Sequence, residues 1–236
     1  MARISRSQRA AQGPRTQRRG VERRERLLRA ARELIARHPL SSVTYAAVCA
    51  RAGVPASSAH HFYPDLDAIF RALLDAHRME MDATLMRPLK ARDTRNWQAI
   101  VECMVDRAAR YHRTHPVGAK LAIGGETPPQ IKRIDRDADR ERAGFALRIA
   151  EDLFVVPRFV DKERVAYIAA ELVDTVFTAS MLETGRLTPA YVTLAKLAAI
   201  GFLGHYLGSN LPARPVVAPR SAVRRGPAGG PPAAAG

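Results

Sequence analysis

The chain has 236 residues, of which 47% are hydrophobic, so it is long and apolar enough to bury a sizeable core. Its first 20 residues lack the apolar stretch of a signal peptide, and no apolar run has the length expected of a membrane-spanning helix. The two cysteines, Cys49 and Cys103, lack a metal-ligand spacing. The composition therefore predicts a cytoplasmic protein with no membrane partner and no cofactor.

The formal net charge of +15 is concentrated at one end of the chain. Residues 1–64 contain 13 arginines and 3 glutamates, whereas residues 65–207 contain 21 basic and 20 acidic residues. A basic end beside a neutral body predicts that the basic end binds a polyanion. A merely solvated basic surface would not explain the balanced body. Membrane binding would need a hydrophobic face near the N-terminus, where residues 1–20 offer only Ile4.

The N-terminal end is expected to be a disordered basic arm over residues 1–20, which are rich in Arg, Gln, Ser, Gly and Pro. Arg18 and Arg19 are candidates for following a phosphate backbone or entering a minor groove, with a solubilising tail as the alternative. A first helix is expected over residues 21–37, because apolar residues recur there at helical spacing. These residues are Leu27, Leu28, Ala31, Leu34 and Ile35.

Residues 44–63 are expected to form two short helices joined by a tight turn. Thr44 suits the N-cap of the first helix, and Gly53 follows it where a positive φ is usually needed. Pro55 fits the start of the second helix, and Pro64 ends that helix. Small and hydroxyl-bearing residues follow Pro55, as suits a helix that approaches a DNA major groove closely. The pattern predicts a helix-turn-helix motif, although similar segments also occur in ordinary helical bundles.

One face of this motif is expected to contact DNA. His60 and His61 are adjacent, which is poor geometry for chelating one metal ion. We therefore expect them to form hydrogen bonds to a phosphate or a base edge. The alternative is that one of them is a packing residue. Ala59 and Tyr63 are expected to face inward. The candidates for DNA contact are Thr44, Tyr45, Pro55, Ala56, Ser57, Ser58, His60, His61, Arg18 and Arg19.

The segment from Arg23 to about His77 resembles the DNA-binding domain of TetR (tetracycline-repressor-like) transcriptional regulators. That domain has an amphipathic helix, a helix ending in Ala-Gly-Val, a short recognition helix, an aromatic pair, Pro and a long helix. The matching residues here are the apolar positions of the first helix, Ala52-Gly53-Val54, His61-Phe62-Tyr63-Pro64 and Ile69. The resemblance covers roughly a quarter of the chain.

The sequence departs from the family pattern at three positions. The family commonly has Ser or Thr where Pro55 stands, Tyr where His60 stands, and Lys near the position of Leu66. Because those Tyr and Lys residues usually touch phosphate, other groups must supply part of the phosphate contacts here.

The remainder of the chain is expected to be a larger helical body, which makes the fold all-α: a three-helix DNA-binding head over residues 21–67 and a ligand-binding and dimerisation domain over residues 68–207. We expect a hinge or loop at residues 116–130 and a disordered tail at residues 208–236. The helices are expected at residues 65–87, 96–114, 129–154, 161–184 and 188–207.

Several features of the body bear on function. The charged first half of the helix at 129–154, which includes Asp139 and Arg142, is expected to be a solvated face with ion pairs between near neighbours. His112 and His115 lack a third ligand, so a structural or pocket role is expected rather than metal binding. Candidate ligand-pocket residues are Trp97, Met104, Phe145, Phe177 and Met181, with ordinary core packing as the alternative for each.

The leading hypothesis is a sequence-specific DNA-binding transcriptional regulator, a repressor that a small molecule releases from its operator. The last two helices carry broad apolar stripes rich in Ala and Gly, so we expect them to form a homodimer interface. A dimer would place two recognition helices in successive major grooves of a near-palindromic operator. The alternative is an architectural or low-specificity DNA-binding protein without ligand control. An enzyme is not expected, because no nucleophile–base pair, paired carboxylates or metal set has a convincing spacing.

Overall fold

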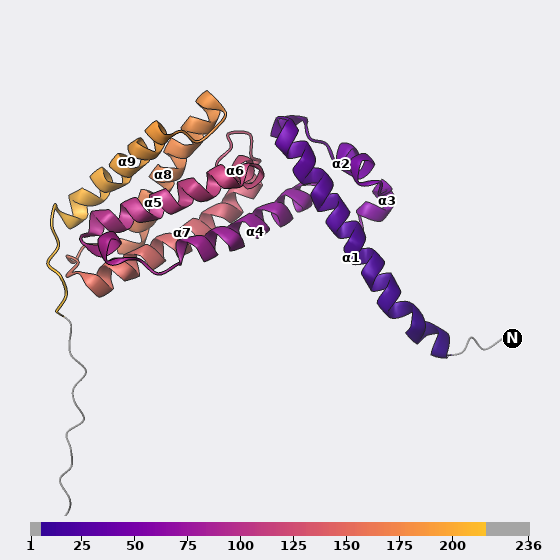
Figure 1. Cartoon of the computed structure of the whole chain (residues 1–236), viewed down its shortest axis with the longest axis horizontal. Helices are drawn as coiled ribbons and strands as arrows, with labels where there is room; N and C mark the ends of the chain where they lie inside the picture. The colour runs from indigo at the N-terminus through magenta and orange to yellow at the C-terminus, as the bar shows by residue number, and fades with distance from the viewer. Residues whose placement is uncertain (1–5, 216–236) are drawn as a thin grey trace, which may run out of the picture.

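The computed structural model describes the backbone of residues 6–215 and the side chains of residues 18–133 and 136–215. These residues form an elongated all-α molecule in which a small head of α1 (Arg6–Arg37), α2 (Tyr45–Ala52) and α3 (Ala56–Ala59) lies at one end (Figure 1). The body contains α4 (Leu66–Leu85), α5 (Trp97–Thr114), α6 (Pro116–Ala122), α7 (Pro129–Leu153), α8 (Lys162–Thr184) and α9 (Pro189–Leu207). The predicted fold class is therefore confirmed.

The local signals of the head act as expected. The Thr44 hydroxyl caps α2 by accepting a hydrogen bond from the Ala47 amide at 3.1 Å. Gly53 ends the helix with φ 60° and ψ 37°, a left-handed conformation that glycine adopts without strain. Val54 is buried in the turn between α2 and α3, and Ala59 and Tyr63 face inward as expected. These contacts fix the angle between the two helices of the motif.

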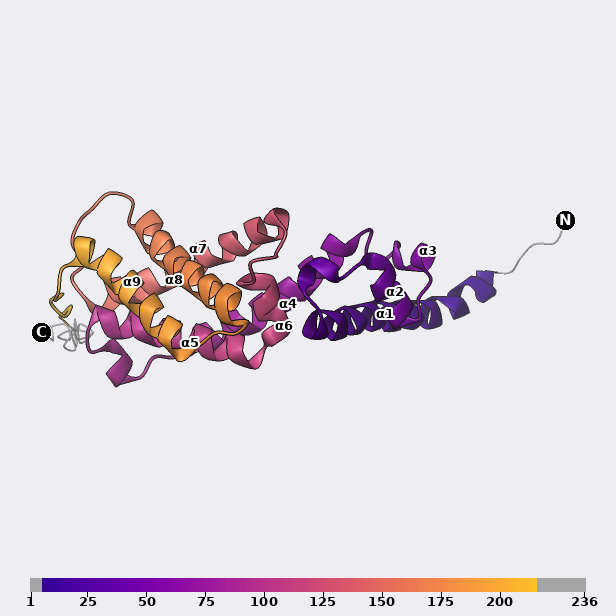
Figure 2. The same cartoon turned by 90° about the horizontal axis from the view of Figure 1, so that it is seen from above.

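The first helix begins much earlier than the sequence predicts. The expected start is residue 21, after a disordered arm, but α1 already begins at Arg6 and projects beyond the rest of the head (Figure 2). Arg, Gln and Ala, which are frequent here, favour a helix, although Gly13 and Pro14 in the same stretch oppose it. Residues 1–5 of the expected arm lie outside the described residues.

Helix α4 joins the head to the body. The Asp65 carboxylate caps its first turn by accepting from the Ala68 amide at 2.7 Å. Leu73 and Leu74 in its first half belong to the same hydrophobic cluster as Leu27 of α1, and Leu85 at its end belongs to it as well. Head and body therefore share one continuous core along α4.

The hinge expected at residues 116–130 is partly helical. Pro116 occupies the first turn of α6, where its missing amide hydrogen costs nothing. Gly118 lies in this helix because the buried ring of His77 occupies the adjacent space: a Cβ on Gly118 would lie 1.9 Å from His77 Nδ1. Close approach to a neighbouring side chain, and not flexibility, therefore explains this glycine.

The tail expected from residue 208 onward is attached to the body over its first residues. The Val155 amide donates to the Pro212 carbonyl, and the Arg214 amide to the Leu153 carbonyl, each at 2.8 Å. The Trp97 indole also donates to the Gly208 carbonyl at 3.2 Å. The prediction of a flexible tail is therefore wrong for residues 208–215, and residues 216–236 lie outside the described part of the chain.

The last two helices are more apolar than expected, and the prediction that no apolar run has the length of a membrane-spanning helix is wrong for them. By length and composition alone, α8 and α9 are each capable of crossing a membrane, a test that core helices of soluble proteins also pass. Only 22% of the most apolar stretch of each helix is buried within the single chain. Leu182 and Leu197, for example, are 66% and 63% exposed. The two helices thus present a large uncovered apolar surface.

Three histidines meet where α4, α5 and α6 converge. The ring centroids of His77 and His112 are 5.3 Å apart, and those of His77 and His115 are 6.3 Å apart. Among the described residues, His77 Nε2 and His112 Nδ1 have no hydrogen-bond partner. Burial, with smaller contributions from neighbouring histidines and Arg142, lowers the pKa of His77 to about 4 and that of His112 to about 3. Both rings are therefore neutral in the folded protein near pH 7.

This cluster predicts that stability falls in mild acid. Between pH 6.5 and about 4 the unfolded chain binds protons at His77 and His112 that the folded chain does not, so each histidine costs roughly 1 kcal/mol of unfolding free energy at pH 5.5 relative to pH 7.5. Urea denaturation at the two pH values measures the difference. The difference in unfolding free energy between the two pH values should be smaller in His112→Gln and unchanged in His205→Gln, which removes an exposed ring. An unchanged difference in His112→Gln would contradict the assignment.

Candidate nucleic-acid interface and body cavity

The exposed surface of the head is formed by α3 and the turn that follows it. Ala56 and Ser57 are exposed at the start of α3, next to Pro55. The helical path continues beyond α3, because the His60 amide donates to the Ala56 carbonyl at 3.0 Å. His61 is exposed in this continuation. Small side chains at the start of such a helix leave room for close approach to another molecule.

Tyr45 and His60 form a preorganised pair beside α3. The Tyr45 hydroxyl donates to the Tyr63 carbonyl at 2.7 Å, and its ring stacks on the His60 ring with centroids 4.8 Å apart. His60 Nδ1 lies 2.8 Å from the Pro64 carbonyl oxygen, which can only accept, so Nδ1 carries the proton. A neutral His60 ring thus has Nε2 left as an acceptor, suited to a base amino group.

Two hydroxyl candidates are already engaged within the head. The Thr44 hydroxyl caps α2 as an acceptor and retains its own O–H donor for an outside oxygen. Ser58 is half-buried and accepts from Arg23 Nη1 of α1 at 3.4 Å. Thr44 is thus available to a phosphate, whereas Ser58 connects α3 to α1.

The arginines of α1 extend the basic surface past α3. Gly20 lies against Phe62, where an added Cβ would be 3.6 Å from the ring, so this part of α1 is next to the turn that follows α3. Arg18 and Arg19 are exposed just beyond Gly20, and Arg18 pairs with Glu22 at 3.2 Å. An exposed pair of this kind contributes little to stability and is readily exchanged for a phosphate.

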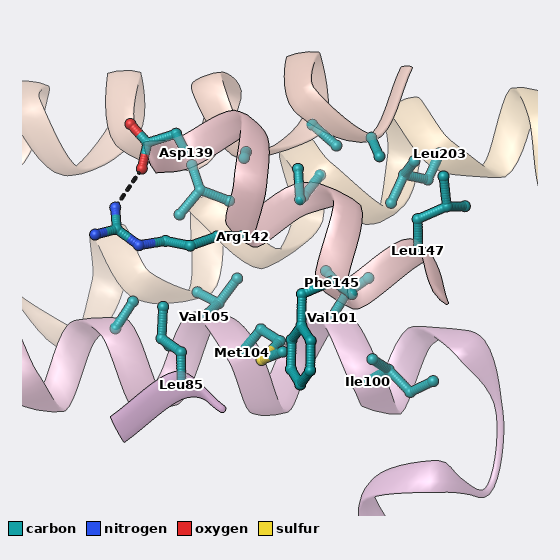
Figure 3. A pocket seen from close by; sticks show the side chains of 18 of the residues that line it. Leu85, Ile100, Val101, Met104, Val105, Asp139, Arg142, Phe145, Leu147 and Leu203 are labelled. Carbon is teal, nitrogen blue, oxygen red and sulfur yellow. Dashed lines mark hydrogen bonds and ion pairs between the residues drawn. The ribbon is translucent and has the colours of Figure 1, made fainter. Parts of the chain in front are cut away.

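The body contains an apolar cavity of about 170 Å³ between α4, α5, α7, α8 and α9 (Figure 3). Trp97, Met104 and Phe145, three of the candidate ligand-pocket residues, line it. Phe177 and Met181 do not line it: Phe177 is fully buried against the His112 ring, with centroids 6.2 Å apart, and Met181 packs on the main core. The volume is close to that of an engineered apolar cavity of about 150 Å³ that binds benzene.

One end of the cavity is charged, which contradicts the expected solvated face on α7. Arg142 donates from Nη1 to Asp139 Oδ1 at 2.7 Å (Figure 3). It also donates from Nε to Asp82 Oδ1 at 2.6 Å. Asp139 is buried, and burial raises the pKa of its carboxyl, although Arg142 opposes this. A signal was present in the sequence: Asp139 and Arg142 are spaced i, i+3 and continue the apolar stripe of Ala146.

The described residues contain no group of His, Cys, Asp or Glu that could hold a metal ion. The two distinctive surfaces are instead an exposed helix-turn-helix head with a basic helix and an apolar cavity in the body joined to it by α4. This arrangement is that of a helix-turn-helix DNA-binding protein with a larger helical body.

Family models match both parts of the chain. Residues 27–73 match the model described as "Bacterial regulatory proteins, tetR family", and residues 95–206 match "Tetracyclin repressor-like, C-terminal domain". The chain therefore belongs to the TetR family of transcriptional regulators, which are DNA-binding proteins and not enzymes. No curated protein matches it significantly.

Solved structures share the fold at low sequence identity. A TetR-family regulator from Streptomyces coelicolor is 20% identical, covers 78% of this chain and 99% of its own, and superposes with a TM-score of 0.57. A TetR regulator from Rhodococcus sp. RHA1 is 19% identical, covers 77% and 96%, and has a TM-score of 0.54. SmeT, from Stenotrophomonas maltophilia, is 16% identical, covers 79% and 91%, and has a TM-score of 0.56.

The exposed face of α3 predicts which substitutions impair DNA binding. Ser57→Glu and His61→Glu each place a negative charge where DNA phosphates would lie, so each should weaken binding to a duplex selected from random sequence at least about tenfold. Ser209→Glu, which adds the same charge at the far end of the body, should have no effect. Fluorescence anisotropy with a labelled duplex measures all three. Wild-type affinity in both head variants would place the interface elsewhere.

Proposed function

We propose that the chain is a homodimeric repressor that acts in the cytoplasm and that a small molecule releases from a near-palindromic operator. The observation that carries this proposal is the position of α4, which lines the cavity with Met81 and Leu85 and shares the core of the head through Leu73 and Leu74. SmeT, which has the same fold, is the repressor of the multidrug efflux pump SmeDEF, and this supports repression as the mode of action.

The uncovered apolar surface of α8 and α9 supports the homodimer. Two copies related by a twofold axis would bury this surface against itself in a four-helix interface. The twofold axis would also relate the two α3 helices, so the operator would be near-palindromic, and binding in successive major grooves would require the two helices to lie roughly 34 Å apart. Dimerisation would thus hold two DNA-binding heads at a fixed spacing.

The dimer can be tested by charging its interface. Leu197→Glu should raise the dimer dissociation constant at least about 100-fold, because it places a carboxylate in an apolar interface. Met79→Glu is the matched control, since Met79 on α4 is 75% exposed and lies outside α8 and α9. Sedimentation equilibrium at micromolar concentration gives both constants. A monomeric wild-type chain would rule out the proposed interface.

The body is connected to the head by a second route through α6. Lys120 donates from Nζ to the Ile35 carbonyl at 2.8 Å and the His38 carbonyl at 3.3 Å, at the C-terminal end of α1. Glu126, after α6, accepts from the Ser41 amide at 2.9 Å. A ligand that changes the packing around α4 would therefore move a head attached at two places. It would do so only to the extent that it binds the two arrangements with different affinity.

Filling the cavity tests the coupling between body and head. Ala146→Phe places a ring where a ligand would lie, so the folded variant should bind the selected operator at least about tenfold more weakly than the wild type. Its binding to random duplex should be unchanged, because the heads are intact. Ala91→Phe, at an exposed position between α4 and α5 that lies outside the cavity and outside α8 and α9, is the control, and circular dichroism verifies folding. Full operator affinity in folded Ala146→Phe would contradict ligand control through this cavity.

A further inference from the structure

Two cavities of the body meet at the same two carboxyl groups. Asp139 on α7 and Asp174 on α8 line the apolar cavity. They also line a second cavity of about 400 Å³ between α7 and α8, and no other residue is common to the two linings. A molecule that occupied the apolar cavity and extended toward the second one would therefore pass these carboxyl groups.

The second cavity has a polar wall, unlike the first. Lys132 and Arg136 of α7 and Glu171 of α8 line it, together with two threonines of α8. Arg136 pairs with Glu171 through Nε at 3.3 Å. The two cavities thus suit the two ends of an amphiphile, with an apolar end among α4, α5 and α9 and a polar end between α7 and α8.

The charges around Asp139 and Asp174, where the two cavities meet, favour a bound cation. The guanidinium of Arg142 is shared by two carboxylates, Asp82 and Asp139, and Arg136 is balanced by Glu171. Arg78 pairs with Asp75 at 3.6 Å, and its charge also lowers the pKa of Asp139. Together with Asp174 and Lys132, the residues named here comprise five acids and four bases. An added anion would be repelled by the carboxyl groups of Asp139 and Asp174, whereas an added cation would be attracted by them.

Burial makes this attraction effective. Asp139 is buried, so its interaction with a charge in the cavity is screened far less than at the surface. Removing the ionised form of Asp139 from water is unfavourable, and a protonated amine beside it would compensate for part of that loss. A neutral head group would provide hydrogen bonds but no such compensation.

We propose that the effector is an amphiphilic amine, with an apolar body of about one ring in the first cavity and its protonated nitrogen at Asp139 and Asp174. This inference rests on the proposed function, in that the apolar cavity is taken as the effector site. It adds the chemical class of the ligand and the residues that select it.

The test uses three probes that differ only in the head group: 3-phenylpropylamine, 3-phenylpropan-1-ol and 3-phenylpropanoate. Trp97 is the only tryptophan of the chain and lines the apolar cavity, so its fluorescence reports binding to the full-length dimer. The amine should bind with a dissociation constant at least about tenfold lower than that of the alcohol or the carboxylate. Equal or weaker binding of the amine would overturn the proposal.

Variants of Asp139 and Asp174 test whether these two residues cause the preference for the amine. Asp174→Asn and Asp139→Asn should each bring the affinity for the amine toward that for the alcohol, while the affinity for the alcohol stays as in the wild type. Glu141→Gln removes an exposed carboxylate of the same helix that lines neither cavity and should retain the full preference. Asp174 is half-buried, so Asp174→Asn decides the question if Asp139→Asn does not fold. Retention of the preference in folded Asp174→Asn would overturn the proposal.

The same probes separate this inference from the proposed function. Operator binding is measured with and without each probe at saturation. Preferential amine binding that leaves the operator bound would contradict ligand control but keep the assignment of ligand class. Release of the operator by all three probes with equal affinity would keep ligand control and overturn the assignment. No binding of the amine would overturn the assignment, and Ala146→Phe would still test the coupling.

Discussion

The whole structure depends on α4, which belongs to one continuous hydrophobic core that extends from the head into the body. Its first half packs with α1 in the head, and its second half forms one wall of the body cavity. Protein interiors are close-packed, so neither half can change its surroundings without displacing the other. A head with a separate core on a flexible linker would bind DNA but would not respond to the body. The continuity from Leu27 through Leu74 to Leu85 therefore connects the two ends of the molecule through packed side chains.

Helix α6 provides a second connection between the head and the body. It contacts the middle of α4 where the His77 ring occupies the space beside Gly118, and it holds the end of α1 through Lys120. The contact to α1 is a cation at the C-terminal end of a helix, where the unpaired carbonyl groups carry partial negative charge. The contact to α4 is tight, because the backbone at Gly118 lies directly against the neutral ring of His77. One short helix thus makes a polar connection to the head and a packed connection to the body.

Small residues shape the body in two different ways. On the inner sides of α7 and α8, alanines such as Ala146 and Ala169 leave the space that becomes the cavity. On the outer sides of α8 and α9, leucines stand among Ala and Gly and are left exposed. An apolar surface of that extent is unusual on a monomer, and two copies of the same surface can cover each other. The body therefore has an apolar interior that a small molecule would fill and an apolar exterior that a second chain would cover.

The sequence by itself determined the local structure. It located the motif at residues 44–63 and most helix ends within one or two residues, because Thr44, Asp65, Asn96 and Thr188 cap helices through contacts three residues away. Of the five candidate pocket residues that it offered, Trp97, Met104 and Phe145 line the cavity, and Phe177 and Met181 do not. Only the tertiary structure decided that Asp139 and Arg142 are buried, that residues 208–215 bond to the end of α7, that α6 lies against His77, and that Phe177 is core. Each of these depends on a partner far away in the chain, whose position no local pattern specifies.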